Sequence, residues 1–174
     1  VRMGTSNTLI CPLRVFPTKT QPIFIAGTKL MVPHGSPIRS FRDLKGKTVV
    51  ATAGTTNADA IEKVSTRFNL DIKVIQARDH ADAFEILRRG GADAYAGDDV
   101  LLYGFLAHYG AGKKFDITRD FLSYDPYGIM LRKNDPQFAA LVDKAVRGLM
   151  TSGEMERLYK QWFLNKLPTG ERIG

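Results

Sequence analysis

The sequence predicts an α/β fold built around an open, mostly parallel sheet. Between residues 47 and 110, short β-branched or small-residue runs alternate with segments whose apolar residues recur at helical spacing. Three such strand–helix pairs within about seventy residues favour right-handed β–α–β crossovers. Apolar extended runs at residues 23–32 and 127–132 flank this core. Two further amphipathic helical segments follow the second of these runs.

Breaks in the periodic pattern divide the core into its elements. Gly54, Gly90 and Gly110 each follow a regular run, where glycine commonly ends an element. We expect strands at residues 47–52, 72–77, 92–96 and 115–122, and helices carrying the apolar residues of 58–68, 79–89 and 98–109. A stripe from Phe138 to Leu149 predicts another helix, and Ser152 is the expected N-cap of the last one.

Length and charge restrict the class of protein. The 174 residues have room for one ordinary domain or two small lobes, and the longest apolar run is too short to span a bilayer. Lys and Arg number 25 against 18 Asp and Glu, which gives a net charge of +7. The basic residues are scattered in short pairs without a nucleic-acid motif, so we expect no nucleic-acid partner.

Motifs for catalysis, cofactors and metals are absent from the sequence. Cys11 is the single cysteine, and His34, His80 and His108 are not spaced as metal ligands. No glycine-rich phosphate loop and no GxSxG turn is present. We therefore expect no catalytic residue, no metal and no cofactor.

Polar residues follow three of the predicted strands, where ligands bind in open parallel sheets. The first strand end supplies Thr52, Gly54 and Thr55, the second His80, and the third Asp98. Glycine lets a ligand approach the backbone, and the following helix start offers N–H groups to a carboxylate. A carboxylate such as that of Asp98 suits a ligand ammonium group. These residues are the predicted ligand site.

Each candidate also has a purely structural interpretation. Thr55 and Asp98 stand where helix N-caps are expected, and His80 could be an ordinary surface histidine at a helix start. The residues alone leave both interpretations open.

Longer segments resemble one known family. They read IFIAGTKLMV, SFRDLKGKTVVATAGTT, ARDHADAFEILRRGGADAYAGDD, YGIMLRKNDPQFAALVDKAV and SGEMERLYKQWF. In unbroken order they resemble the family 3 solute-binding proteins of bacterial ABC importers, and most closely the glutamate/aspartate-binding branch. The resemblance implies a type II periplasmic binding protein-like fold, in which two α/β lobes are joined by two hinge strands. Residues 1–32 would form a partial first lobe and hinge strand, 33–123 a complete doubly wound second lobe, and 124–174 the return strand and C-terminal helices.

The same resemblance implies a function and residue roles. Thr52 and Thr55 would contact the ligand, with Thr55 at its α-carboxylate, while Asp98 would hold the α-ammonium and His80 the side-chain carboxylate. The protein would bind glutamate or aspartate in the periplasm for delivery to the permease of an ABC importer. It would not be an enzyme.

Two departures from the family pattern matter. Much of the N-terminal lobe has no counterpart here, and residues 10–21 (ICPLRVFPTKTQ) stand where the family has a charged stretch with a ligand-binding arginine. Arg14 lies nearby but outside that motif. We expect a homodimer that completes the partial lobe. The alternatives are a truncated relative that has lost ligand binding and a cyclohexadienyl dehydratase-like enzyme.

Overall fold

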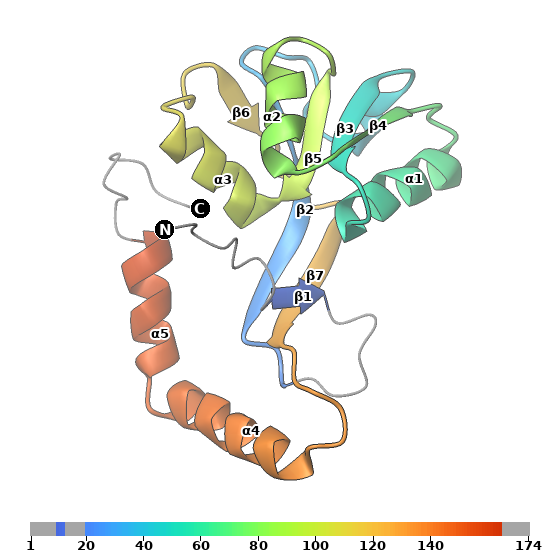
Figure 1. Cartoon of the computed structure of the whole chain (residues 1–174). Helices are drawn as coiled ribbons and strands as arrows, with labels where there is room; N and C mark the ends of the chain where they lie inside the picture. Colours follow the sequence, from blue (N-terminus) through green and yellow to red (C-terminus); the bar gives the residue numbers. More distant parts are fainter. Residues whose placement is uncertain (1–9, 13–19, 165–174) are drawn as a thin grey trace, which may run out of the picture. The chain divides into compact units, whose positions relative to one another are not determined.

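The computed structural model describes residues 10–12 and 20–164, and the chain divides into two compact units. Among the described residues, unit 1 comprises 10–12, 20–26 and 125–164, and unit 2 comprises 27–124. Two neighbouring strands of the sheet, β2 (Phe24–Pro33) and β7 (Ser123–Ile129), contribute residues to both units. Figure 1 labels the elements in chain order.

Unit 2 contains a mixed sheet. Strand β3 (Thr48–Thr52) pairs in parallel with β4 (Lys73–Ala77) and β5 (Ala94–Asp98). Strand β2 runs antiparallel to β5 and to β6 (Phe115–Ile117). The sequence predicted a mostly parallel sheet, and the difference lies in β2. Crossover helices keep β3, β4, β5 and β6 parallel to one another. Strand β2 precedes this series in the chain and lies between β5 and β6, antiparallel to both.

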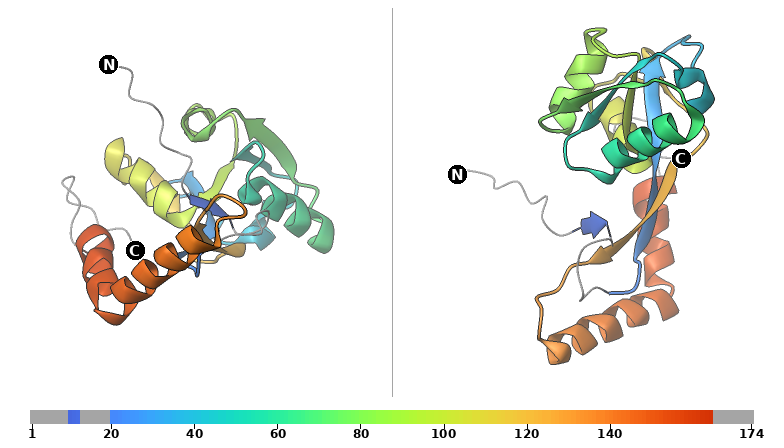
Figure 2. Two further views of the ribbon diagram at one scale, coloured as in Figure 1. Left: turned by 60° about the horizontal axis from the view of Figure 1, so that its bottom comes forward. Right: turned by 90° about the vertical axis from the view of Figure 1, so that its right-hand side faces the viewer.

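Helices cover both faces of this sheet (Figures 1 and 2). They are α1 (Thr56–Phe68), α2 (His80–Arg88) and α3 (Asp99–His108). Val49 and Ala51 of β3 pack in one core with Ile61 of α1, while Val50 packs in the other with Phe84 of α2. Successive side chains of a strand point to opposite faces. The unbroken apolar run of β3 therefore supplies both cores, as in a doubly wound sheet.

Local sequence signals account for the helix ends of unit 2. Thr55 is the N-cap of α1, and Asp79 is the N-cap of α2, where its carboxylate accepts a hydrogen bond from the Asp82 N–H at 2.8 Å. Asn69, with φ 51°, ends α1 in the left-handed region. The expected strand at 115–122 forms only as β6. Beyond it, isolated bonds from Thr118 N–H and Leu122 N–H to carbonyls of β2 replace a regular ladder.

Unit 1 contains a short strand pair and two consecutive helices. Strand β1 (Ile10–Pro12) pairs antiparallel with β7, which begins and ends earlier than the expected strand at 127–132. Helix α4 (Pro136–Thr151) is followed by α5 (Glu154–Tyr159) and a π-helical turn, η2 (Lys160–Leu164). Among the described residues, no helix combines the length and apolar character needed to cross a membrane.

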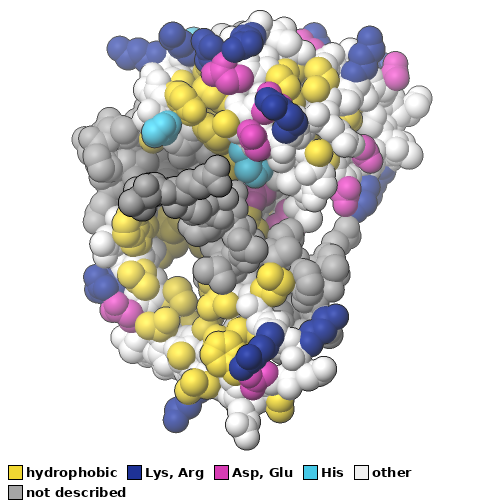
Figure 3. All heavy atoms as spheres, viewed as in Figure 1, with side chains coloured by type: hydrophobic (Ala, Val, Ile, Leu, Met, Phe, Trp, Pro, Cys, Tyr) yellow, Lys and Arg dark blue, Asp and Glu magenta, His cyan; other side chains and the backbone are white. Residues whose placement is uncertain are grey.

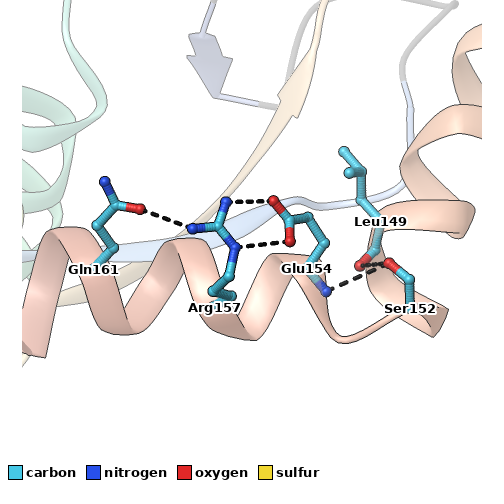
Figure 4. A network of polar contacts seen from close by, with 5 residues as sticks. All are labelled: Leu149, Ser152, Glu154, Arg157 and Gln161. Atoms are coloured by element: carbon cyan, nitrogen blue, oxygen red, sulfur yellow. Dashed lines mark hydrogen bonds and ion pairs between the residues drawn. The ribbon is translucent and has the colours of Figure 1, made fainter.

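The turn between α4 and α5 corrects one expectation. Gly153, with φ 78°, is the N-cap of α5, and Ser152 is the C-cap of α4. The left-handed conformation at Gly153 changes the direction of the chain between the two helices, and glycine adopts that conformation without strain. The Ser152 hydroxyl still accepts a hydrogen bond from the Glu154 N–H at 3.4 Å, and Arg157 pairs with Glu154 in the first turn (Figure 4).

We predict that Gly27→Ala lowers the free energy of unfolding by about 1–3 kcal/mol, the usual cost of overpacking. A Cβ at Gly27 would overlap the Phe121 ring and lie 2.6 Å from the Ser123 carbonyl oxygen. Urea denaturation measures the change. The control is Gly104→Ala in α3, where a Cβ meets nothing within 4 Å and helix propensity improves. Equal stability of the two variants would contradict the prediction.

Candidate functional site

The ends of three neighbouring strands meet at one edge of unit 2. Thr52 ends β3 and lies beside Ala77, the last residue of β4. On the other side of β3, Ala51 pairs with Ala96, and β5 continues to Asp98. His80 begins α2 directly after β4. Strand order and register therefore gather the predicted site residues at a single edge, as the sequence analysis expected.

The turn after β3 is held by Thr55. Gly54 has φ 70°, and no heavy atom lies within 4 Å of where its Cβ would be. The Thr55 hydroxyl donates to the Thr52 carbonyl at 2.7 Å and accepts from the Ala58 N–H at 3.4 Å. The capping interpretation of Thr55 is thus correct for its side chain. Helix α1 starts directly after this turn, and the first N–H groups of a helix have no intrahelical acceptor.

Asp98 occupies the N-cap position of α3 without capping it. Its side chain makes no cap hydrogen bond. The neighbouring Asp99 carboxylate instead accepts from the Val100 N–H at 2.9 Å and the Gly27 N–H at 3.4 Å. Asp99 therefore has a structural role, and the capping interpretation does not explain Asp98.

A buried polar group beside Asp98 was missed by the sequence analysis. Thr28 of β2 pairs in register with Asp98 and is fully buried. Its hydroxyl donates to the Asn57 side-chain oxygen at 2.6 Å and lies 2.8 Å from the Ser123 hydroxyl. These bonds join β2, α1 and β7 within unit 2. A threonine inside an apolar strand gives no signal for such a role, because β-branched residues are common in strands.

His80 is tied to two neutral hydroxyl groups. Its Nδ1 atom lies 2.9 Å from Thr52 Oγ1 and 3.0 Å from the Tyr95 hydroxyl. Tyr95 is fully buried in the middle of β5, on the face covered by α2, and was not among the predicted site residues. Ala94 and Ala96 face the other core. Because side chains alternate along a strand, the sequence could have indicated that Tyr95 points to the opposite face.

Burial controls the protonation of this group. It lowers the pKa of His80 and outweighs the opposing effect of Asp79, so the imidazole is neutral at pH 7. The pKa of Tyr95 is raised by burial, so its hydroxyl stays protonated. Because the unfolded chain binds the His80 proton more readily, this histidine disfavours the folded state progressively as the pH falls below 6.5.

Other parts of unit 2 show no comparable set of functional groups. An open hollow of about 590 Å³ is lined by residues such as Arg39, Ser40 and Arg119, and by none of the predicted site residues. Among the described residues, no three His, Cys, Asp or Glu side chains lie close enough together to hold a metal ion. Arg14 lies outside the described residues.

Many basic side chains form local ion pairs. On α2, Arg88 pairs with Glu85 at 2.8 Å, and just before it Arg78 pairs with Asp82 at 3.2 Å. On the face seen in Figure 3, Lys and Arg side chains lie among Asp and Glu side chains. These ion pairs offset part of the positive charge that is scattered along the sequence.

Comparison with known proteins assigns a family. The model of the bacterial extracellular solute-binding proteins, family 3, matches residues 18–165. The glutamate/aspartate import solute-binding protein of Salmonella typhimurium is 40% identical over 146 residues, which are 84% of this chain and 48% of that protein. The L-glutamate/L-aspartate-binding protein of Pseudomonas aeruginosa is 37% identical over the same shares of both chains. The chain spans about half the length of these curated relatives.

Solved structures agree on the fold. The GluR0 ligand-binding core from Nostoc punctiforme, in complex with L-glutamate, matches with a TM-score of 0.67 and 33% identity, over 83% of this chain and 63% of that one. A mutant of ArgBP from T. maritima matches with a TM-score of 0.71 and 30% identity, over 90% and 63%. The expected α/β fold of the periplasmic binding protein-like, type II class is confirmed.

We predict that Thr55→Ala lowers the free energy of unfolding by about 1 kcal/mol, since the variant loses the N-cap of α1. Thr66→Ala, which removes an exposed hydroxyl bonded to the Glu62 carbonyl of the same helix, is the control and should change stability little. Urea denaturation followed by circular dichroism compares the two. A cost as large for Thr66→Ala as for Thr55→Ala would refute the capping role.

Proposed function

This chain belongs to family 3 of the bacterial extracellular solute-binding proteins, and we propose that it binds glutamate or aspartate for delivery to the permease of an ABC importer. The single observation that carries the proposal is the convergence of Thr52, His80 and Asp98 at one sheet edge. The names of the Salmonella and Pseudomonas relatives support the choice of an acidic amino acid.

The turn at Gly54 and Thr55 suits the α-carboxylate of the ligand. The first N–H groups of α1 and the positive end of the helix dipole favour an anion there. Gly54 leaves room for close approach, since nothing lies within 4 Å of its Cβ position. The Thr55 hydroxyl holds the turn by its bond to the Thr52 carbonyl. In this proposal the carboxylate is bound mainly by backbone donors.

Asp98 and His80 suit the other charged groups of an acidic amino acid. The Asp98 carboxylate would accept hydrogen bonds from the α-ammonium group, a charge-assisted pairing. His80 would donate from its second ring nitrogen to the side-chain carboxylate, because its Nδ1 already faces the hydroxyls of Thr52 and Tyr95. Together the three positions match the three charged groups of glutamate or aspartate.

The whole-protein context belongs to the same proposal. Residues 1–32 and 124–174 would form a partial first lobe and 33–123 the second lobe, and the lobes would close on the ligand about the hinge strands. The protein would act in the periplasm and catalyse no reaction. The relatives are binding proteins for import by name, which supports this part.

We predict that Asp98→Asn weakens binding of L-glutamate and L-aspartate about 10- to 100-fold, because a hydrogen bond to a charged group is lost. The measurement is calorimetric titration of protein that has been unfolded and refolded to remove carried-over ligand. Asp120→Asn, at an exposed carboxylate that is not among the predicted site residues, is the matched control and should bind as the parent does. No binding by the parent, or unchanged binding by Asp98→Asn, would refute the proposal.

We also propose that two copies of the chain associate. Large apolar side chains of unit 1 are exposed, among them Leu141 at 63% and Trp162 at 60%. Exposed apolar clusters of this kind commonly mark interfaces. The occupant proposed here is a second copy, as expected from the sequence.

Light scattering across a concentration series tests the association. We predict twice the mass of the chain at high concentration and a shift toward the monomer for Leu141→Glu. Ala140→Glu, on the stripe of α4 that carries Lys144 and Arg147, is the control and should leave the mass unchanged. A monomer at every concentration would rule the homodimer out.

A further inference from the structure

Three polar atoms meet beneath the sheet edge and form a triangle. His80 Nδ1 lies 2.9 Å from Thr52 Oγ1 and 3.0 Å from the Tyr95 hydroxyl. Tyr95 is completely buried, and Thr52 is 7% exposed. Within the part of the chain that the structure describes, neither hydroxyl has a hydrogen-bond partner outside the triangle.

Counting hydrogens selects one protonation state. Each hydroxyl carries one hydrogen, and a buried hydroxyl needs an acceptor for it. If Nδ1 carries no hydrogen, its lone pair is an acceptor for the hydrogen of either hydroxyl group. If Nδ1 is protonated, neither hydroxyl can donate to it, and three hydrogens share the two hydroxyl oxygens.

The same count applies to the charged imidazolium, which carries hydrogens on both nitrogens. The charged groups near His80 do not reverse it. Asp79, the N-cap of α2, favours the imidazolium form of His80. Asp98 at the end of β5 contributes to raising the pKa of Tyr95. Thr52 from β3 and Tyr95 from β5 present only neutral hydroxyls. Burial outweighs the effect of Asp79 and lowers the pKa of His80, in agreement with the hydrogen count.

We propose that Tyr95, together with Thr52, is a positioning residue that holds His80 as the neutral tautomer with its proton on Nε2. Nε2 lies across the ring from the hydroxyl pair, so its N–H is directed away from them. The site thereby presents a neutral N–H donor from Nε2, and the lowered pKa keeps His80 neutral to a lower pH than an ordinary histidine. That this donor meets the ligand side chain rests on the proposed function, whereas the tautomer itself does not.

Nitrogen-15 NMR of the ligand-free protein tests the tautomer directly. In the parent protein, His80 should show a protonated Nε2, an unprotonated Nδ1 and a titration midpoint below 6.5. The double variant Thr52→Val/Tyr95→Phe removes both donors to Nδ1. We expect it to populate both tautomers and to raise the midpoint by about one pH unit. Each single variant retains one donor to Nδ1 and should keep the parent tautomer.

Tyr103→Phe on α3 is the control, because Tyr103 makes no contact with His80 among the described interactions, and it should leave the His80 signals unchanged. Circular dichroism confirms that each variant folds. A parent protein with its proton on Nδ1, or a folded double variant with the parent tautomer and midpoint, would overturn the proposal.

A second measurement connects the tautomer to the ligand. L-glutamate is titrated into the parent at pH 7 in two buffers with different heats of ionisation. A neutral donor that stays neutral takes up no proton, so the heats observed in the two buffers should agree without correction for buffer ionisation. Proton uptake on binding would contradict the fixed neutral state. Absence of any binding would instead refute the proposed function, while the NMR result would still decide the tautomer.

Discussion

Burial of strand β3 on both faces is the constraint on which the rest of unit 2 depends. Val49, Val50 and Ala51 are all at 0% exposure, with α1 against one face and α2 against the other. Interiors packed to this degree leave little room for a strand to shift. The end of β3 at Thr52 is therefore fixed, and with it the turn of Gly54 and the start of α1. The candidate site is positioned by packing that lies entirely behind it.

Polar groups beneath the edge extend this rigidity into the site itself. The Thr28–Asn57–Ser123 bonds and the Thr52–His80–Tyr95 triangle both lie in surroundings where an unsatisfied donor is unfavourable. Each group joins at least two different elements of unit 2. A ligand at the proposed site would contact side chains whose orientations are set before it arrives, which would lower the entropy lost on binding.

Local patterns predicted the elements and much of the edge, but not the contacts between strands. Periodicity and capping residues placed α1, α2 and α3 within a few residues, and the strand ends placed Thr52, His80 and Asp98 together. Tyr95 could not be assigned to His80 without knowing that β3 lies between β4 and β5, and strand order is not encoded in local periodicity. For the same reason, the sequence analysis did not predict that β2 is antiparallel to its neighbours, and the strand expected at 115–122 forms only over Phe115–Ile117. Ser152 was the expected N-cap of α5, and Gly153 occupies that position instead. The conformation of this connection depends on the angle between α4 and α5, which local sequence does not encode.

The position of Trp162 has a consequence for optical measurements. It is the single tryptophan of the chain, it lies in unit 1 and it is largely exposed. Unit 2 contains no indole among residues 27–124. Emission excited at the red edge of the protein absorption band therefore originates in unit 1, and unit 2 adds no indole emission of its own. Far-ultraviolet ellipticity, to which the helices of both units contribute, is the complementary probe, and disagreement between the two signals would reveal units that unfold separately.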